Sequence, residues 1–63
     1  MEETYIRLKE IIKATEINYK WISKATNISV RTIKRWMKGS HQPHPVLFLE
    51  LKKVVDRLFD LTF

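Results

Sequence analysis

The chain has 63 residues, which predicts a single small domain over residues 1–63. Hydrophobic residues make up 44% and charged residues 30%, as in globular proteins, and the lack of cysteine excludes disulfides, thiolate metal sites and sulfur redox chemistry. The net charge of +5 predicts an anionic partner. Neither a signal-peptide pattern nor an apolar run of roughly 20 residues occurs, so we expect a soluble domain with no membrane partner.

Positive charge is concentrated in the middle of the chain. Residues 17–49 contain no acidic residue and carry six basic ones, which are Lys20, Lys24, Arg31, Lys34, Arg35 and Lys38. The two ends together sum to about −1. A basic block that also carries two tryptophans and a tyrosine favours nucleic acid as the partner, although a solvated helix face would look similar.

Two helices are predicted in the first half of the chain. Apolar residues recur with helical spacing over residues 2–14. A second helix is expected from an N-cap at Asn18 to about Ala25. Asn27 tolerates a left-handed backbone and Ser29 can cap a further helix, so residues 26–29 are predicted to form a turn.

The third predicted helix, residues 30–38, has two chemically distinct faces and ends at Gly39. One arc of this helix is apolar and contains Val30, Ile33, Trp36 and Met37. We expect this arc, Trp36 included, to be buried in the core. A neighbouring arc contains only cations, namely Arg31, Lys34, Arg35 and Lys38. This helix is therefore predicted to present a positive face to solvent.

A loop with two prolines leads to a fourth helix, predicted from Pro45 to about Asp60. This helix has two apolar stripes. The first stripe, or seam, consists of Leu47, Leu51, Val54, Leu58 and Leu61, and the second consists of Phe48, Val55 and Phe59. The predicted fold is all-α. It is a compact bundle of four helices, or five if the last one is divided, with a helix-turn-helix over about residues 18–38 and a long apolar C-terminal helix over about residues 45–60.

The two stripes of the last helix exceed what one small core requires. We expect one stripe to close the core and the other to leave an apolar patch for a homodimer. The residues assigned to this dimer interface are Val55, Leu58, Phe59, Leu61 and Phe63. The alternative is that the first helix covers both stripes.

Residues 16–39, EINYKWISKATNISVRTIKRWMKG, resemble the lambda-repressor-like, or Cro/Xre-type, helix-turn-helix domains of phage and bacterial regulators. Ile22 and Ser23 stand at the family's usual Leu-Ala pair, and Thr32 and Ile33 open the core of its recognition helix. The similarity extends to about Val55 and covers two-thirds of the chain. Asn27 replaces the common turn glycine, and Tyr19 replaces the usual glutamine.

This resemblance implies a role for ten residues. Base edges in the major groove would be read by Val30, Arg31, Lys34 and Arg35. Phosphates would be contacted by Asn18, Tyr19, Lys20, Lys38, Ser40 and His41. The implied function is that of a sequence-specific transcriptional regulator, a repressor that binds a palindromic operator as a dimer in the cytoplasm or nucleoid of a bacterial host.

Two other functions remain open on sequence alone. An excisionase-like or architectural DNA-binding factor for recombination shares the pattern of residues 31–36, but such domains continue into a β-wing. A protein-interaction module, an antirepressor or adaptor, would hold a protein partner through Trp21 or the C-terminal helix.

The pattern of polar residues predicts no enzyme, no cofactor and no metal site. No serine, histidine and acid are spaced as in a catalytic triad, and the acids lie towards the ends of the chain. His41 and His44 have no cysteine or acid nearby to complete a set of metal ligands. A loop contact with phosphate is the better interpretation of His41.

Overall fold

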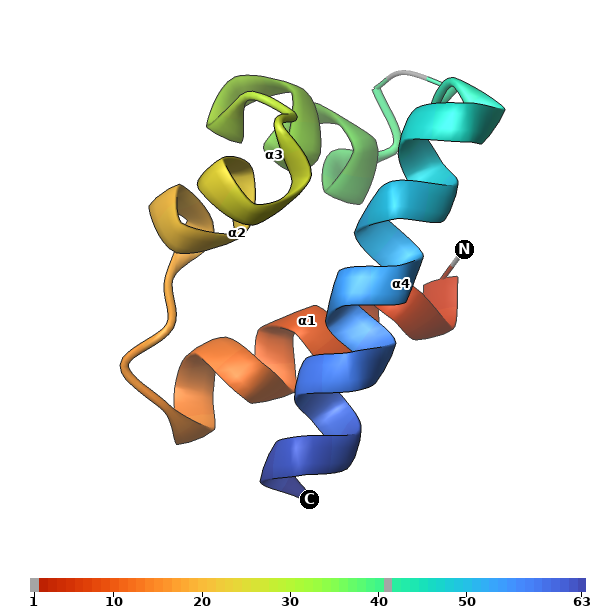
Figure 1. Cartoon of the computed structure of the whole chain (residues 1–63). Helices are drawn as coiled ribbons and strands as arrows, with labels where there is room; N and C mark the ends of the chain where they lie inside the picture. Colours follow the sequence, from red (N-terminus) through yellow and green to blue (C-terminus); the bar gives the residue numbers. More distant parts are fainter. Residues whose placement is uncertain (1, 41) are drawn as a thin grey trace.

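The computed structural model describes residues 2–40 and 42–63, with the backbone alone for residue 2 (Figure 1). Four helices account for the fold: α1 (Glu2–Ala14), α2 (Tyr19–Thr26), α3 (Val30–Lys38) and α4 (Pro45–Thr62). No strand occurs in these two ranges. The predicted all-α fold is confirmed, and α2 and α4 end one and two residues later than expected.

The helices are arranged around α4, the longest element. Figure 1 shows α1 crossing α4, while α2 and α3 lie towards its N-terminal half. The C-terminal end of α4 extends away from α2 and α3. The α2–α3 pair thus lies at one end of the molecule, supported by two helices from the ends of the chain.

Local hydrogen bonds determine where α2 and α3 begin. The Asn18 Oδ1 atom accepts a hydrogen bond from the Trp21 N–H at 2.9 Å, and Ser29 Oγ accepts one from the Thr32 N–H at 3.1 Å. Between them Asn27 adopts a left-handed conformation with φ 60°, and the Ile28 N–H donates to the Thr26 hydroxyl. Both caps and the turn confirm the sequence prediction.

Gly39 ends α3, as predicted. Its φ of 77° lies in the left-handed region, where a side chain is strained. The Gly39 N–H donates to the Trp36 carbonyl at 3.0 Å, and the Ser40 N–H donates to the Arg35 carbonyl at 3.1 Å. These two bonds satisfy carbonyls that the last turn of a helix would otherwise leave unpaired.

All four helices and the α2–α3 turn contribute to one core. Its buried apolar residues are Leu8, Ile11, Ile22, Ile28, Ile33, Trp36, Leu51 and Val55. The Phe48 ring of α4 contacts both α1 and α3. It packs edge-on against the Tyr5 ring, with 5.8 Å between the ring centres, and lies 6.3 Å from Trp36, again between ring centres. Trp36 is thus a core residue, as predicted, and it anchors the inner face of α3.

A polar cluster ties α1 to α4. The Arg7 guanidinium donates to Asp56 at 2.9 Å and to Glu3 at 2.8 Å, and Lys52 donates to the other Asp56 oxygen at 2.8 Å. The hydrogen bond from Lys52 and the nearby Arg7 lower the pKa of Asp56, against the opposing effect of desolvation. Arg7 also lies 5.0 Å from the centre of the Phe59 ring.

This α1–α4 contact corrects one part of the predicted dimer interface. Val55 has no solvent exposure, so it belongs to the core and cannot form part of a surface between copies. Phe59 is half-buried beside Arg7. By contrast Leu61 is 78% and Leu47 41% exposed, although both belong to the other seam. The first helix therefore covers the Phe48–Val55–Phe59 stripe, and the open edge of α4 is that of Leu47 and Leu61.

Candidate nucleic-acid interface

The outer face of α3 presents four cations to solvent. Ile33 and Trp36 are buried on its inner face. The exposed side chains on the opposite side are Arg31, Lys34, Arg35 and Lys38. Because residues 17–49 contain no acid, no carboxylate of α2, α3 or their turn neutralises this face. Such a surface attracts anions and offers hydrogen-bond donors but no acceptor among its charged groups.

The structure brings the predicted base-reading residues together on α3. Arg31, Lys34 and Arg35 are exposed, and Val30 is half-buried in the first turn beside them. In the described part of the chain none of the three cations has an ion-pair partner. No carboxylate of the described residues thus neutralises their charge.

Tyr19 links the beginning of α2 to α3. The Lys34 Nζ atom lies 5.1 Å from the centre of the Tyr19 ring, within the range of a cation–π contact. Tyr19 is half-buried, and its side chain packs against the hydrophobic core. The contact restrains the Lys34 side chain on the outer side of α3.

A basic hollow beside α3 includes a residue that the sequence analysis did not single out. The hollow has a volume of about 380 Å³ and is lined by Lys9, Tyr19, Lys34, Met37 and Lys38. Three lysines therefore line it, and none of them has a carboxylate within 4.0 Å among residues 3–40 and 42–63. Lys9 comes from α1, outside the acid-free block, and only the packing of α1 brings it here. A phosphate-sized anion suits this arrangement.

The remaining predicted phosphate contacts have mixed surroundings. Asn18 is exposed, but its Oδ1 atom is already used to cap α2. Lys20 and Ser40 are exposed, and His41 lies outside the described residues. The Ile22 N–H donates to the Asn18 carbonyl at 3.1 Å, and the Trp21 N–H donates to the Asn18 side chain. The first-turn N–H groups of α2 that lack an intrahelical acceptor, and that suit an anion, are therefore those of Tyr19 and Lys20.

The chain matches no protein-family model, no curated protein and no solved structure.

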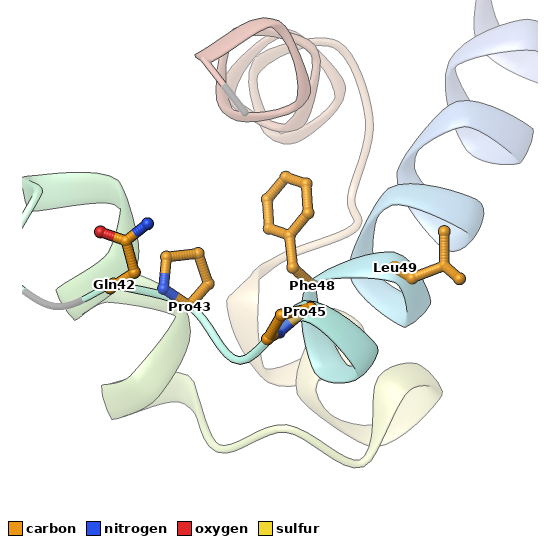
Figure 2. Close-up of a pocket in the computed structure, with 5 residues that line it drawn as sticks. All are labelled: Gln42, Pro43, Pro45, Phe48 and Leu49. Atoms are coloured by element: carbon orange, nitrogen blue, oxygen red, sulfur yellow. The ribbon is translucent and has the colours of Figure 1, made fainter.

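A second hollow lies at the beginning of α4, away from the cations. It measures about 380 Å³ and is lined by Gln42, Pro43, Pro45, Phe48 and Leu49. In Figure 2 the Phe48 ring points towards α1, with Gln42 and Pro43 on one side of it and Leu49 on the other. The lining contains no charged group, so this hollow offers no cation to an anion.

His44 caps α4, because its Nδ1 atom accepts a hydrogen bond from the Val46 N–H at 3.2 Å. Among the described residues no three potential metal ligands come together. Trp21 is 46% exposed on α2. Within the same residues no helix is both long and apolar enough to cross a bilayer.

Proposed function

We propose that this chain is a sequence-specific double-stranded DNA-binding protein whose α2 and α3 act as a helix-turn-helix of the Cro/Xre type. The observation that carries the proposal is the outer face of α3, with four exposed cations opposite a buried apolar face. A helix of this kind fits the major groove, where arginine donates two hydrogen bonds to guanine.

In this proposal α3 reads the bases and its surroundings hold the phosphates. Arg31, Lys34 and Arg35 face the base edges, with Val30 in apolar contact at the start of the helix. The first turn of α2, Lys20 and Lys38 contact the backbone, and the basic hollow around Tyr19 adds Lys9 to this set. Phosphate contacts position the protein on the duplex, and base contacts select the sequence.

We further propose that the protein is a transcriptional repressor that acts as a homodimer. Two copies related by a two-fold axis would read the two halves of a palindromic operator, and bound protein would exclude polymerase from an overlapping promoter. Neither an enzymatic activity nor a cofactor is part of this proposal.

The arrangement after α3 favours this function over the excisionase-like alternative. A β-wing would require strands after the recognition helix, whereas the described residues 42–63 lead directly into α4. A protein-interaction module remains the alternative from another class, and exposed Trp21 is the observation in its favour. Salt-dependent binding to DNA separates the two, because a module without that function has no need of the cationic face.

Selection of bound duplexes from a random pool, at near-physiological salt, tests the proposal. We expect an enriched palindrome whose half-sites lie about one helical turn apart. A single unrepeated motif would contradict the dimer but not the DNA-binding function. No enrichment, together with no binding at low salt, would overturn the proposal itself.

A further inference from the structure

The open edge of α4 combines apolar and charged residues in a regular order. Leu47, Val54 and Leu61 are spaced by seven residues, or two helical turns, so they lie in one line. Leu58 lies beside this line, within about 60° of arc for all four residues. Leu61 and Leu47 are exposed, and Val54 and Leu58 are half-buried. An apolar line about 21 Å long therefore remains partly uncovered.

Two opposite charges flank this line on its solvent side. Glu50 and Arg57 are exposed, and neither has an ion-pair partner in the described part of the chain. Along the helix axis Glu50 lies about 6 Å before Val54, and Arg57 about 4.5 Å after it. The two charges are thus nearly symmetric about Val54, with opposite signs.

We propose that this edge, formed by Leu47, Glu50, Val54, Arg57, Leu58 and Leu61, packs antiparallel against the same edge of a second copy. This inference rests on the proposed function, for which it supplies the dimer. A two-fold axis at Val54 places Leu47 opposite the partner's Leu61. It also places Glu50 within about 1.5 Å, along the axis, of the partner's Arg57. Both contacts occur twice, as a two-fold interface requires.

The charges select this orientation over the parallel one. In a parallel pair the two-fold axis runs along the helices and places this charged flank on opposite sides of the interface in the two copies, so neither Glu50 nor Arg57 meets an opposite charge of the partner. The pattern is complementary to itself only when one copy is reversed. A second copy is thus the occupant that the edge fits, because an unrelated protein would not share the symmetry about Val54.

Charge reversal tests the orientation in solution without DNA. Sedimentation equilibrium from low micromolar to near-millimolar concentration should show a monomer–dimer equilibrium. We expect Glu50→Arg and Arg57→Glu each to weaken the dimer about five- to tenfold, and a mixture of the two variants to restore it. The matched control is Glu16→Lys, an exposed acid between α1 and α2 and outside the edge, which should leave the dimer unchanged.

Cysteine pairing provides a second measurement, since the chain contains no cysteine. Under oxidising conditions Val54→Cys should form a disulfide-linked dimer. A mixture of Leu47→Cys and Leu61→Cys should give the mixed dimer in preference to either symmetric one. A monomer at every concentration, a dimer indifferent to both reversals, or preferential symmetric pairing would each overturn the inference.

The same variants keep this inference separate from the proposed function. If α4 does not mediate a dimer but the protein selects a DNA sequence, only the inference fails. If the dimer forms as described but no DNA is bound, the DNA-binding function fails and the α4 interface stands.

Discussion

The ammonium group of Lys34 lies 5.1 Å from the centre of the Tyr19 ring, so the first residue of α2 restrains a cation on the outer face of α3. A free lysine side chain loses conformational freedom when it binds, and a restrained one loses less. Tyr19 is thus expected to act through Lys34 more than through its own hydroxyl.

Substitution of Tyr19 separates the ring from the hydroxyl group. Tyr19→Phe keeps the aromatic face and should bind DNA as the wild type does. Tyr19→Leu removes the cation–π contact and should weaken binding about two- to fivefold, as expected for about 0.5–1 kcal/mol. Fluorescence anisotropy with the selected operator measures both. Equal losses in the two variants would instead assign the role to a hydroxyl–phosphate contact.

Arg35→Ala should relax the preference for one base pair. If Arg35 donates two hydrogen bonds to a guanine, its loss costs about 1–3 kcal/mol on the preferred site and much less on a site altered at that position. The comparison needs a set of single-base operator variants. Lys20→Ala is the control, because the loss of a phosphate contact should weaken binding equally to all of these operator variants. Uniform weakening by Arg35→Ala would make Arg35 a phosphate contact too.

Lys9→Gln tests the basic hollow. We expect weaker binding to every duplex and a slope of log K against log salt that is smaller by about 1, as for the loss of one phosphate contact. Lys53→Gln makes the same change of charge on α4, outside the hollow, and should leave the slope nearly unaltered. If both variants reduce the slope alike, net charge rather than the hollow is responsible.

Two leucines of α4 should differ widely in their contribution to stability. Leu51 has no solvent exposure, and Leu51→Ala should lower the free energy of unfolding by about 2–5 kcal/mol. Leu61 is exposed, so Leu61→Ala should change it by no more than about 0.5 kcal/mol in the monomer. Urea unfolding followed by circular dichroism, at low protein concentration, gives both values. A large loss for Leu61→Ala would mean that α4 packs differently.

Acid should weaken the link between α1 and α4. Because Lys52 and Arg7 lower the pKa of Asp56 in the folded state, this carboxylate stabilises the fold above its ordinary pKa of about 3.9. The contribution is lost as the pH falls through the lowered folded value. Asp56→Asn should therefore flatten the pH dependence of stability below about pH 4, whereas Asp60→Asn should not. The measurement is the free energy of unfolding of both variants between neutral and acid pH. A flattened pH dependence in Asp60→Asn but not in Asp56→Asn would contradict this prediction.

Features determined by neighbouring residues could be predicted from the sequence. Asn18, Ser29 and Gly39 act within one helical turn, so their caps and the limits of α2 and α3 follow from local chemistry. Residues of α4 show where this fails. Both apolar stripes are plausible from periodicity, and the choice between them depends on α1, whose Arg7 contacts Asp56 across 49 positions of sequence. Lys9 was missed for the same reason.

The division of α3 into two faces has a consequence for how such a protein could change over generations. Its inner face carries the buried residues, whereas the side chains of Arg31, Arg35 and Lys38 are exposed and form no ion pair with another helix in the described part of the chain. Exchanges at these exposed positions should each alter the free energy of unfolding by about 0.5 kcal/mol or less. New binding preferences could thus arise one substitution at a time, and every intermediate in that history would still fold.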